Sequence, residues 1–291
     1  MIGSVRRGCV VVVLGMLAGS VAIGWADAAL TFRHRFRVGE SLTYRLIADQ
    51  SIEFSLLLLP GQIQNWTSHL EMDMLQKVVA VGNGASRLEC SFHDPKGETM
   101  ALGNKAPIPG VDGLSKLRLA IQMNQQGEIS APRVINPQEV SDATVQAALS
   151  GLQVYTQSFL VFPGKPLKTG ESWRRSQEIP LEFLEASQAS LKVDSKYTWI
   201  GTEEKAGKTC ARIQVDMTLS LKGGEGKIAG QAVSAHMKGT GKGEMLFSLA
   251  DSRLQKSDLS LEAEGLMTAS LYGQPLQNQI KMGLHMNTEL K

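Results

Sequence analysis

Strict alternation of apolar and polar residues is the feature that most limits how this chain of 291 residues can fold. Residues 211–221 place apolar side chains at odd positions and polar side chains at even positions. Successive side chains of a β-strand point to opposite faces, so this period predicts a long strand with one apolar and one polar face. The same alternation recurs at 32–38, 42–46, 88–92, 117–123, 259–271 and 280–290.

Short links rich in Gly, Asn and Asp separate these stretches, which predicts hairpins and therefore antiparallel neighbours. An antiparallel sheet can leave its polar face in water, but its apolar face needs a second layer. We therefore predict a mainly β fold built from long antiparallel strands. The predicted turns lie at 38–40, 82–84, 126–127, 205–207, 223–224 and 250–252.

One segment, residues 137–159, breaks the period of two. Its apolar residues recur at steps of four, three, three and four, which is a helical stripe. Pro137 suits a first helical turn and Ser141 offers a cap. We predict one central amphipathic helix over 141–160 that lies on a sheet. Its stripe consists of Val145, Leu149, Leu152, Tyr155 and Phe159.

Residues 1–28 have the pattern of a signal peptide. Arg6 and Arg7 precede an uncharged apolar run over 9–23, and Ala26-Asp27-Ala28 offers a cleavage site after Ala28. The run of roughly 15 residues is shorter than the roughly 20 that a membrane-spanning helix needs. We predict a protein exported to the periplasm or secreted, with a retained membrane anchor as the alternative.

The two halves of the chain share an order of features, which favours an internal duplication over chance similarity of hairpins. Residues 38–45 resemble 169–175, and the later stretch 79–90, which includes Cys90, resembles 199–210, which includes Cys210. We therefore predict two related curved sheets or half-barrels. The expected division is a signal peptide at 1–28, a first β unit at 29–136, a linking helix at 137–162 and a second β unit at 163–291.

The stretch from Phe162 to Trp173 reads Phe-Pro-Gly-Lys-Pro-Leu-Lys-Thr-Gly-Glu-Ser-Trp. Together with the export signal and the long alternating strands, it resembles a family of secreted bacterial β-rich proteins that has no assigned function. That resemblance covers most of residues 30–290 and implies no catalytic residue. Long strands with a covering helix also resemble, in architecture alone, the LolA-type lipoprotein carriers, half-barrels that shelter acyl chains.

Motifs for catalysis or metal binding are not found in the sequence. The five histidines lack metal-ligand spacing, and no nucleophile elbow occurs. His34 shares an apolar face with Phe32 and Phe36, which predicts a buried, hydrogen-bonded side chain, and His285 lies on a polar face. The Gly-rich stretch 239–243 predicts a bulge or flexible turn. We predict no enzymatic activity, no metal and no cofactor.

The charge pattern restricts the partners. A net charge of +2 argues against nucleic acid. Arg33, Arg35 and Arg37 form one basic stripe. We favour the interpretation that these charges protect an edge strand from aggregation, and the alternative is that they bind an anionic envelope partner. We expect Cys90 and Cys210 to be small buried residues, with a disulfide between them as the alternative.

Methionine and leucine on the apolar faces carry the functional hypothesis. Aromatic residues make up only 5% of the chain, and flexible methionines suit apolar ligands of variable shape. We predict a non-enzymatic envelope protein that shelters a lipid or acyl chain. The alternative is a structural or protein-interaction module with a fully packed core. The predicted lining is Met72, Met74, Met123, Met217, Met267, Met282, Met286, Leu149 and Leu152.

Overall fold

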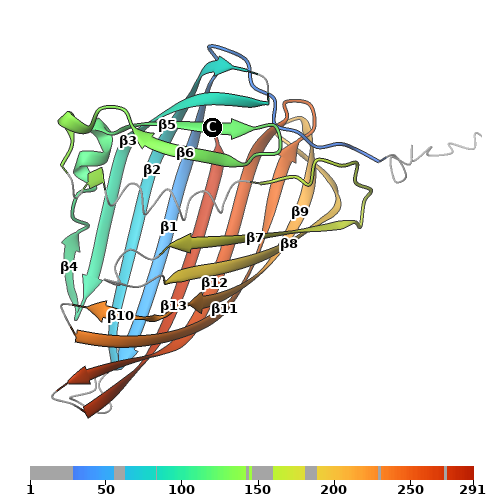
Figure 1. Cartoon of the computed structure of the whole chain (residues 1–291). Coiled ribbons are helices and arrows are strands. Elements are labelled where there is room, and N and C mark those ends of the chain that lie inside the picture. The colour runs from blue at the N-terminus through green and yellow to red at the C-terminus, as the bar shows by residue number, and fades with distance from the viewer. Residues whose placement is uncertain are drawn as a thin grey trace, which may run out of the picture.

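The fold is one large antiparallel β-sheet (Figure 1). The computed structural model describes residues 29–55, 63–82, 84–141, 144–145, 160–180, 189–228, 231–271 and 274–291. The predicted signal peptide, 1–28, lies outside these residues.

The described strands form two successive meanders. The first contains β1 (Ser41–Ser55), β2 (Ile63–Val81), β3 (Ala85–Ala101), β4 (Asn104–Pro107), β5 (Arg118–Asn124) and β6 (Ile129–Val134). The second contains β7 (Ser172–Pro180), β8 (Ser190–Lys205), β9 (Lys208–Lys222), β10 (Glu225–Ile228), β11 (Gln231–Ser248), β12 (Arg253–Leu271) and β13 (Gln274–Leu290). The strand order is β6-β5-β3-β2-β1-β13-β12-β11-β9-β8-β7, with β4 on β3 and β10 on β11.

The prediction of two separate sheets or half-barrels is wrong, because the meanders join into one sheet. β1 and β13 pair from Tyr44 opposite Leu290 to Phe54 opposite Ile280. Without this pairing each meander would present an edge with open backbone N–H and C=O groups, and pairing the two edges satisfies them. The division at 29–136, 137–162 and 163–291 stays a prediction.

The alternation predicted from the sequence is confirmed in the long strands. In β9 the odd positions Ala211 to Leu219 are buried, and Gln214, Asp216 and Thr218 between them are exposed. Segment 32–38 differs, because it alternates in burial without forming a strand. There the His34 N–H donates to the Gln125 carbonyl at 2.8 Å. The three arginines of this segment therefore do not protect an edge strand.

The Gly-rich stretch 239–243 lies inside β11, so the predicted bulge or turn at this place is wrong. Its residues pair in unbroken register with β9 on one side and β12 on the other. A Cβ atom at Gly243 would lie 2.2 Å from the Asp258 carbonyl oxygen and 2.6 Å from Leu259 Cδ2. Glycine is therefore used here for close packing rather than for a change of chain direction.

The predicted central helix over 141–160 is not supported. In the described part of the chain the helical elements are short: the longest, η2 (Asp112–Lys116), has five residues, and η3 is Pro137–Glu139. Pro137 opens only this 3₁₀ turn, because Val140 returns to an extended conformation with φ −131° and ψ 151°. Val145 N–H then donates to the Ser141 carbonyl at 3.0 Å. Most of the predicted stripe, Leu149 and Leu152 included, lies outside the described residues.

The core fills one end of the apolar face, which we call the closed end. Figure 1 shows β5 and β6 at one edge, and β7 and β8 at the other, curving over the same face, and their side chains meet in one cluster. Phe162 packs edge-on against Phe247 with ring centroids 4.8 Å apart, and Trp173 stacks on Tyr197 at 5.3 Å. Segments 29–38 and 160–168 thus supply the second layer that the apolar face requires.

The two meanders open on turns with the same hydrogen bonds. Gly39 N–H donates to the Val78 carbonyl at 2.9 Å, and Gly170 N–H donates to the Trp199 carbonyl at 2.7 Å. Both glycines have positive φ angles, 84° and 87°, that other residues rarely adopt. In each turn a glutamate side chain also accepts from the backbone N–H three residues earlier, at 3.1 Å from Arg37 and 2.9 Å from Lys168.

This correspondence changes the predicted alignment of the cysteines. The β-bulge after Val78 in β2 matches the β-bulge after Trp199 in β8. Val78 lies opposite Leu88, and Trp199 lies opposite Ile213. Leu88 on β3 therefore corresponds to Ile213 on β9. The residues three positions before them are Ala85 and Cys210, so Cys90 and Cys210 are not equivalent. Both cysteines are buried and unbonded, as the alternation predicts. The duplication itself stays a prediction.

Candidate functional site

The apolar face differs between its two ends. At the closed end its side chains belong to the packed core, but farther along the central strands the large apolar residues are only half-buried. We call this second region the half-buried end. It consists of Ile52, Phe54, Trp66, Leu261, Met267, Ile280, Met282 and Leu284.

The strand register joins these side chains into one strip. Ile52 on β1 lies directly opposite Trp66 on β2 and Met282 on β13. Met282 in turn lies opposite Ala263 on β12. Directly opposed residues on one face of an antiparallel pair have Cβ atoms about 4.5–5.5 Å apart, so their side chains touch. The half-buried end is therefore a continuous apolar surface across four neighbouring strands.

No charged residue of these strands shares this part of the face, but amide side chains do. Gln50 Nε2 donates to Met282 Sδ at 3.9 Å. Asn278 lies two residues before Ile280, on the same face, and its buried Oδ1 has no hydrogen-bond partner among the described residues. A buried acceptor without a partner costs roughly 1–3 kcal/mol. The strip is thus uncharged, with amide side chains at Gln50 and Asn278.

The predicted lining residues fall into three groups. Met74, Met123 and Met217 are buried in the core cluster of the closed end, so they do not line an accessible surface. Met72 and Met286 are partly buried and pack against that core. Met267 and Met282 belong to the half-buried end. Leu149 and Leu152 lie outside the described residues, and lining of a ligand site by the predicted set stays a prediction.

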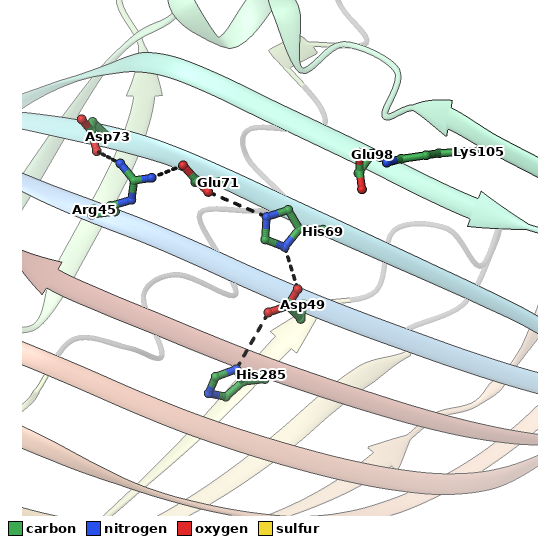
Figure 2. Close-up of polar contacts among 8 residues, drawn as sticks. All are labelled: Arg45, Asp49, His69, Glu71, Asp73, Glu98, Lys105 and His285. Atoms are coloured by element: carbon green, nitrogen blue, oxygen red, sulfur yellow. Dashed lines mark hydrogen bonds and ion pairs between the residues drawn. The ribbon is translucent and has the colours of Figure 1, made fainter.

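The polar face carries a ladder of ionisable side chains across the central strands (Figure 2). Asp49 on β1 lies directly opposite His69 on β2 and His285 on β13. Asp49 Oδ1 is 2.7 Å from His69 Nδ1, and Asp49 Oδ2 is 3.9 Å from His285 Nδ1. The ladder, which we define as these contacts and their extensions, continues through Glu71, Arg45 and Asp73 on one side and through Asp258 on the other.

The ladder links neighbouring strands of the sheet. His285 Nε2 is 3.0 Å from Asp258 Oδ1, and this contact lowers the pKa of that carboxyl against the opposing effect of its partial burial. Among the described residues neither His69 nor His285 hydrogen-bonds to a hydroxyl or thiol that could act as a nucleophile. The described chain also has no group of three or more His, Cys, Asp or Glu placed to hold a metal ion. Exposed cross-strand pairs of this kind stabilise a sheet weakly.

His34 confirms the expectation of a buried, hydrogen-bonded histidine. Its Nε2–H donates to the Leu160 carbonyl at 2.9 Å, which ties segment 29–38 to segment 160–168. Burial lowers the pKa of His34 to about 4, with a smaller contribution from the positive charge of Arg253. The side chain is therefore neutral at neutral pH. Gly127 makes the contact feasible, since a Cβ there would lie 2.3 Å from the Leu160 oxygen.

The alternation in the sequence did not reveal either the strip or the ladder. It places Asp49 and His285 on polar faces, but they are 236 positions apart in the sequence and their strands meet only through the β1–β13 pairing. The signal that was available is composition. On β1 and β13 the residues of the apolar face are uncharged. The residues that alternate with them on the polar face include charged ones, such as Glu53 and Lys281.

No protein-family model and no curated protein matches this chain. Among solved structures, the chain is similar to lipovitellin, in a structure described as showing lipid–protein interactions, with 11% identity and a TM-score of 0.48. The match covers 88% of this chain and 25% of the other, so this chain spans about a quarter of its length.

At this TM-score the similarity carries no conclusion about a ligand or a family. The resemblance of residues 162–173 to secreted bacterial proteins therefore stays a prediction. In the described ranges no helix combines the length and the apolar content needed to cross a membrane.

Proposed function

We propose that this chain is an exported, non-enzymatic protein that binds an apolar ligand, such as a lipid or acyl chain, on the half-buried end of its sheet. The observation that carries the proposal is the continuous uncharged strip over β2, β1, β13 and β12. Its side chains are partly accessible, whereas equivalent side chains of the closed end are fully packed. Export rests on the pattern of residues 1–28 alone.

Physical chemistry supports a ligand of low polarity. Removing apolar surface from water stabilises a complex by about 25 cal/mol per Å². The methionine and leucine side chains of the strip adapt to ligands of different shape at little cost. Gln50 and Asn278 supply amide groups that orient a hydroxyl or carboxyl at a defined place.

A packed structural or interaction module is the second candidate, favoured by the extensive core of the closed end. The two candidates differ in what purified protein retains. A lipid-binding protein keeps lipid through native purification, and a packed module does not. Native mass spectrometry of the mature chain therefore separates them.

The experiment compares wild-type protein with Ile52→Gln/Met282→Gln, which places two amides in the middle of the strip. Its control, Glu53→Gln/Lys281→Gln, changes the adjacent directly opposed pair on the polar face. We expect wild-type and control proteins to carry lipid and the strip variant to lose most of it, with all three folded by circular dichroism. Lipid-free wild-type protein, or equal retention in both variants, would contradict the proposal.

A further inference from the structure

We propose that a basic hollow at one end of the strands is a binding site for a phosphate group. The hollow has a volume of about 690 Å³ and lies where segment 33–37 passes the ends of β1, β2, β3, β9, β12 and β13. It is separate from the half-buried end, so the inference goes beyond the proposed ligand of the apolar face. Its charged lining consists of Arg33, Arg35, Arg37, Lys208, Arg253, Glu40 and Asp251.

Positive charge exceeds negative charge in this hollow. Five of the lining residues are cations and two are carboxylates, so the surplus is three positive charges. Both carboxylates are already engaged: Glu40 pairs with Arg253, and Asp251 lies 2.7 Å from Lys208 Nζ. The cations without a carboxylate partner among the described residues are the three arginines at 33, 35 and 37.

Arg253 is the fixed element of the site. Only 4% of this residue is exposed, its guanidinium lies 4.8 Å above the Phe36 ring centre, and Nη1 donates to the Ser252 carbonyl at 3.0 Å. Its buried Nε has no partner among the described residues. A buried cation is costly unless it is paired, and among the described residues Glu40 is the one carboxylate that pairs with it. An anion in the hollow would stabilise it further.

Arginine is the side chain best suited to phosphate. Its planar guanidinium offers parallel N–H donors that match two phosphate oxygens, and it stays charged at every physiological pH. Segment 31–37 alternates in burial, with Phe32 and His34 buried between exposed arginines, so Arg33, Arg35 and Arg37 project from one side of an anchored segment. The arrangement therefore provides a row of phosphate donors rather than one isolated charge.

A phosphate can arrive on a lipid headgroup or on a soluble compound. Two exposed apolar side chains stand beside the hollow: Val81 lines it and is 48% exposed, and Val38, which follows Arg37, is 67% exposed. Basic residues next to exposed apolar ones are typical of surfaces that bind anionic lipid bilayers. We therefore expect the lipid-borne phosphate to bind more tightly than the soluble one.

The test uses the mature full-length chain. Co-sedimentation is measured with vesicles of phosphatidylcholine alone and with added phosphatidylglycerol, and calorimetric titration is measured with glycerol 3-phosphate. The variant Arg35→Gln/Arg37→Gln removes two unpaired charges of the hollow. Its control, Arg118→Gln/Arg174→Gln, removes two exposed arginines elsewhere, so the net charge is the same.

Wild-type protein should bind the phosphatidylglycerol vesicles, and the hollow variant should bind them about thirtyfold more weakly, because each basic residue near an anionic surface contributes about 1 kcal/mol. The control should stay close to wild type. Binding of glycerol 3-phosphate without vesicle binding supports the site and assigns it to a soluble phosphate. Equal losses in both variants, or no binding of either phosphate by the wild-type protein, would overturn the inference. Lipid retained on the half-buried end has no bearing on these results.

Discussion

The two ends of the apolar face are built from the same alternating strands and differ in what covers them. At the closed end, Phe32 and Phe162 from segments outside the sheet pack onto β8 and β11. At the half-buried end, Ile52 and Met282 pack against neighbours in their own sheet and remain half-buried. The period of two therefore creates an apolar face, and separate segments decide which part of it becomes a core.

Deleting matched phenylalanines at the two ends tests this difference most strongly. We expect Phe247→Ala at the closed end to lower the free energy of unfolding by about 3–5 kcal/mol, because it leaves a cavity among buried rings. Phe54→Ala at the half-buried end should lower the free energy of unfolding by less than about half of that amount. Urea denaturation measures both values. Equal losses would mean that the two ends are packed alike.

Acidification should weaken the closed end through His34. Its pKa is about 4 when folded and 6.5 when free, so the unfolded chain takes up a proton first as the pH falls. Neutral His34 therefore makes its full contribution to the free energy of unfolding above pH 6.5. This contribution decreases by about 3 kcal/mol as the pH falls to 4. Comparing the stability of wild type and His34→Gln across this range measures it.

The control for that experiment is His236→Gln, which removes an exposed imidazole with no ion pair among the described residues. It should keep the wild-type dependence of stability on pH between 6.5 and 4. If His34→Gln keeps the same slope as well, the acid sensitivity comes from other groups and the role given to His34 is wrong.

The smallest effect is expected on the polar face. Asp49→Asn removes the carboxylate between His69 and His285, both of which are substantially exposed. Exposed ion pairs contribute about 1 kcal/mol or less, so the melting temperature should fall slightly. Glu264→Gln, an exposed carboxylate with no ion pair among the described residues, should leave it unchanged. A large loss from Asp49→Asn would make the ladder a main support of the sheet.

Local features of the sequence predicted the strands and turns well. The alternation over 211–221 sets the burial of β9, and the glycines of the two opening turns adopt the positive φ angles that their places require. These features depend on neighbours along the chain, which the sequence displays directly. The burial of His34 followed from the same local reasoning.

Long-range contacts could not be predicted in this way. The pairing of β1 with β13 depends on the register of strands more than 200 residues apart, so one sheet and two sheets have the same local pattern. The same limit explains why Met74 and Met123 were placed on a ligand surface although they are core residues. Arg33, Arg35 and Arg37 looked like the protection of an edge, and only the tertiary structure places them around a hollow with Arg253.

Photolabelling with a fatty acid that carries a diazirine on its chain is the most direct test of ligand binding on the half-buried end. After irradiation and proteolysis, we expect labelled peptides from β1, β12 and β13 around Ile52, Met267 and Met282. An excess of unlabelled fatty acid should abolish this labelling. Labels confined to other surfaces, or labelling that resists competition, would contradict binding on the half-buried end.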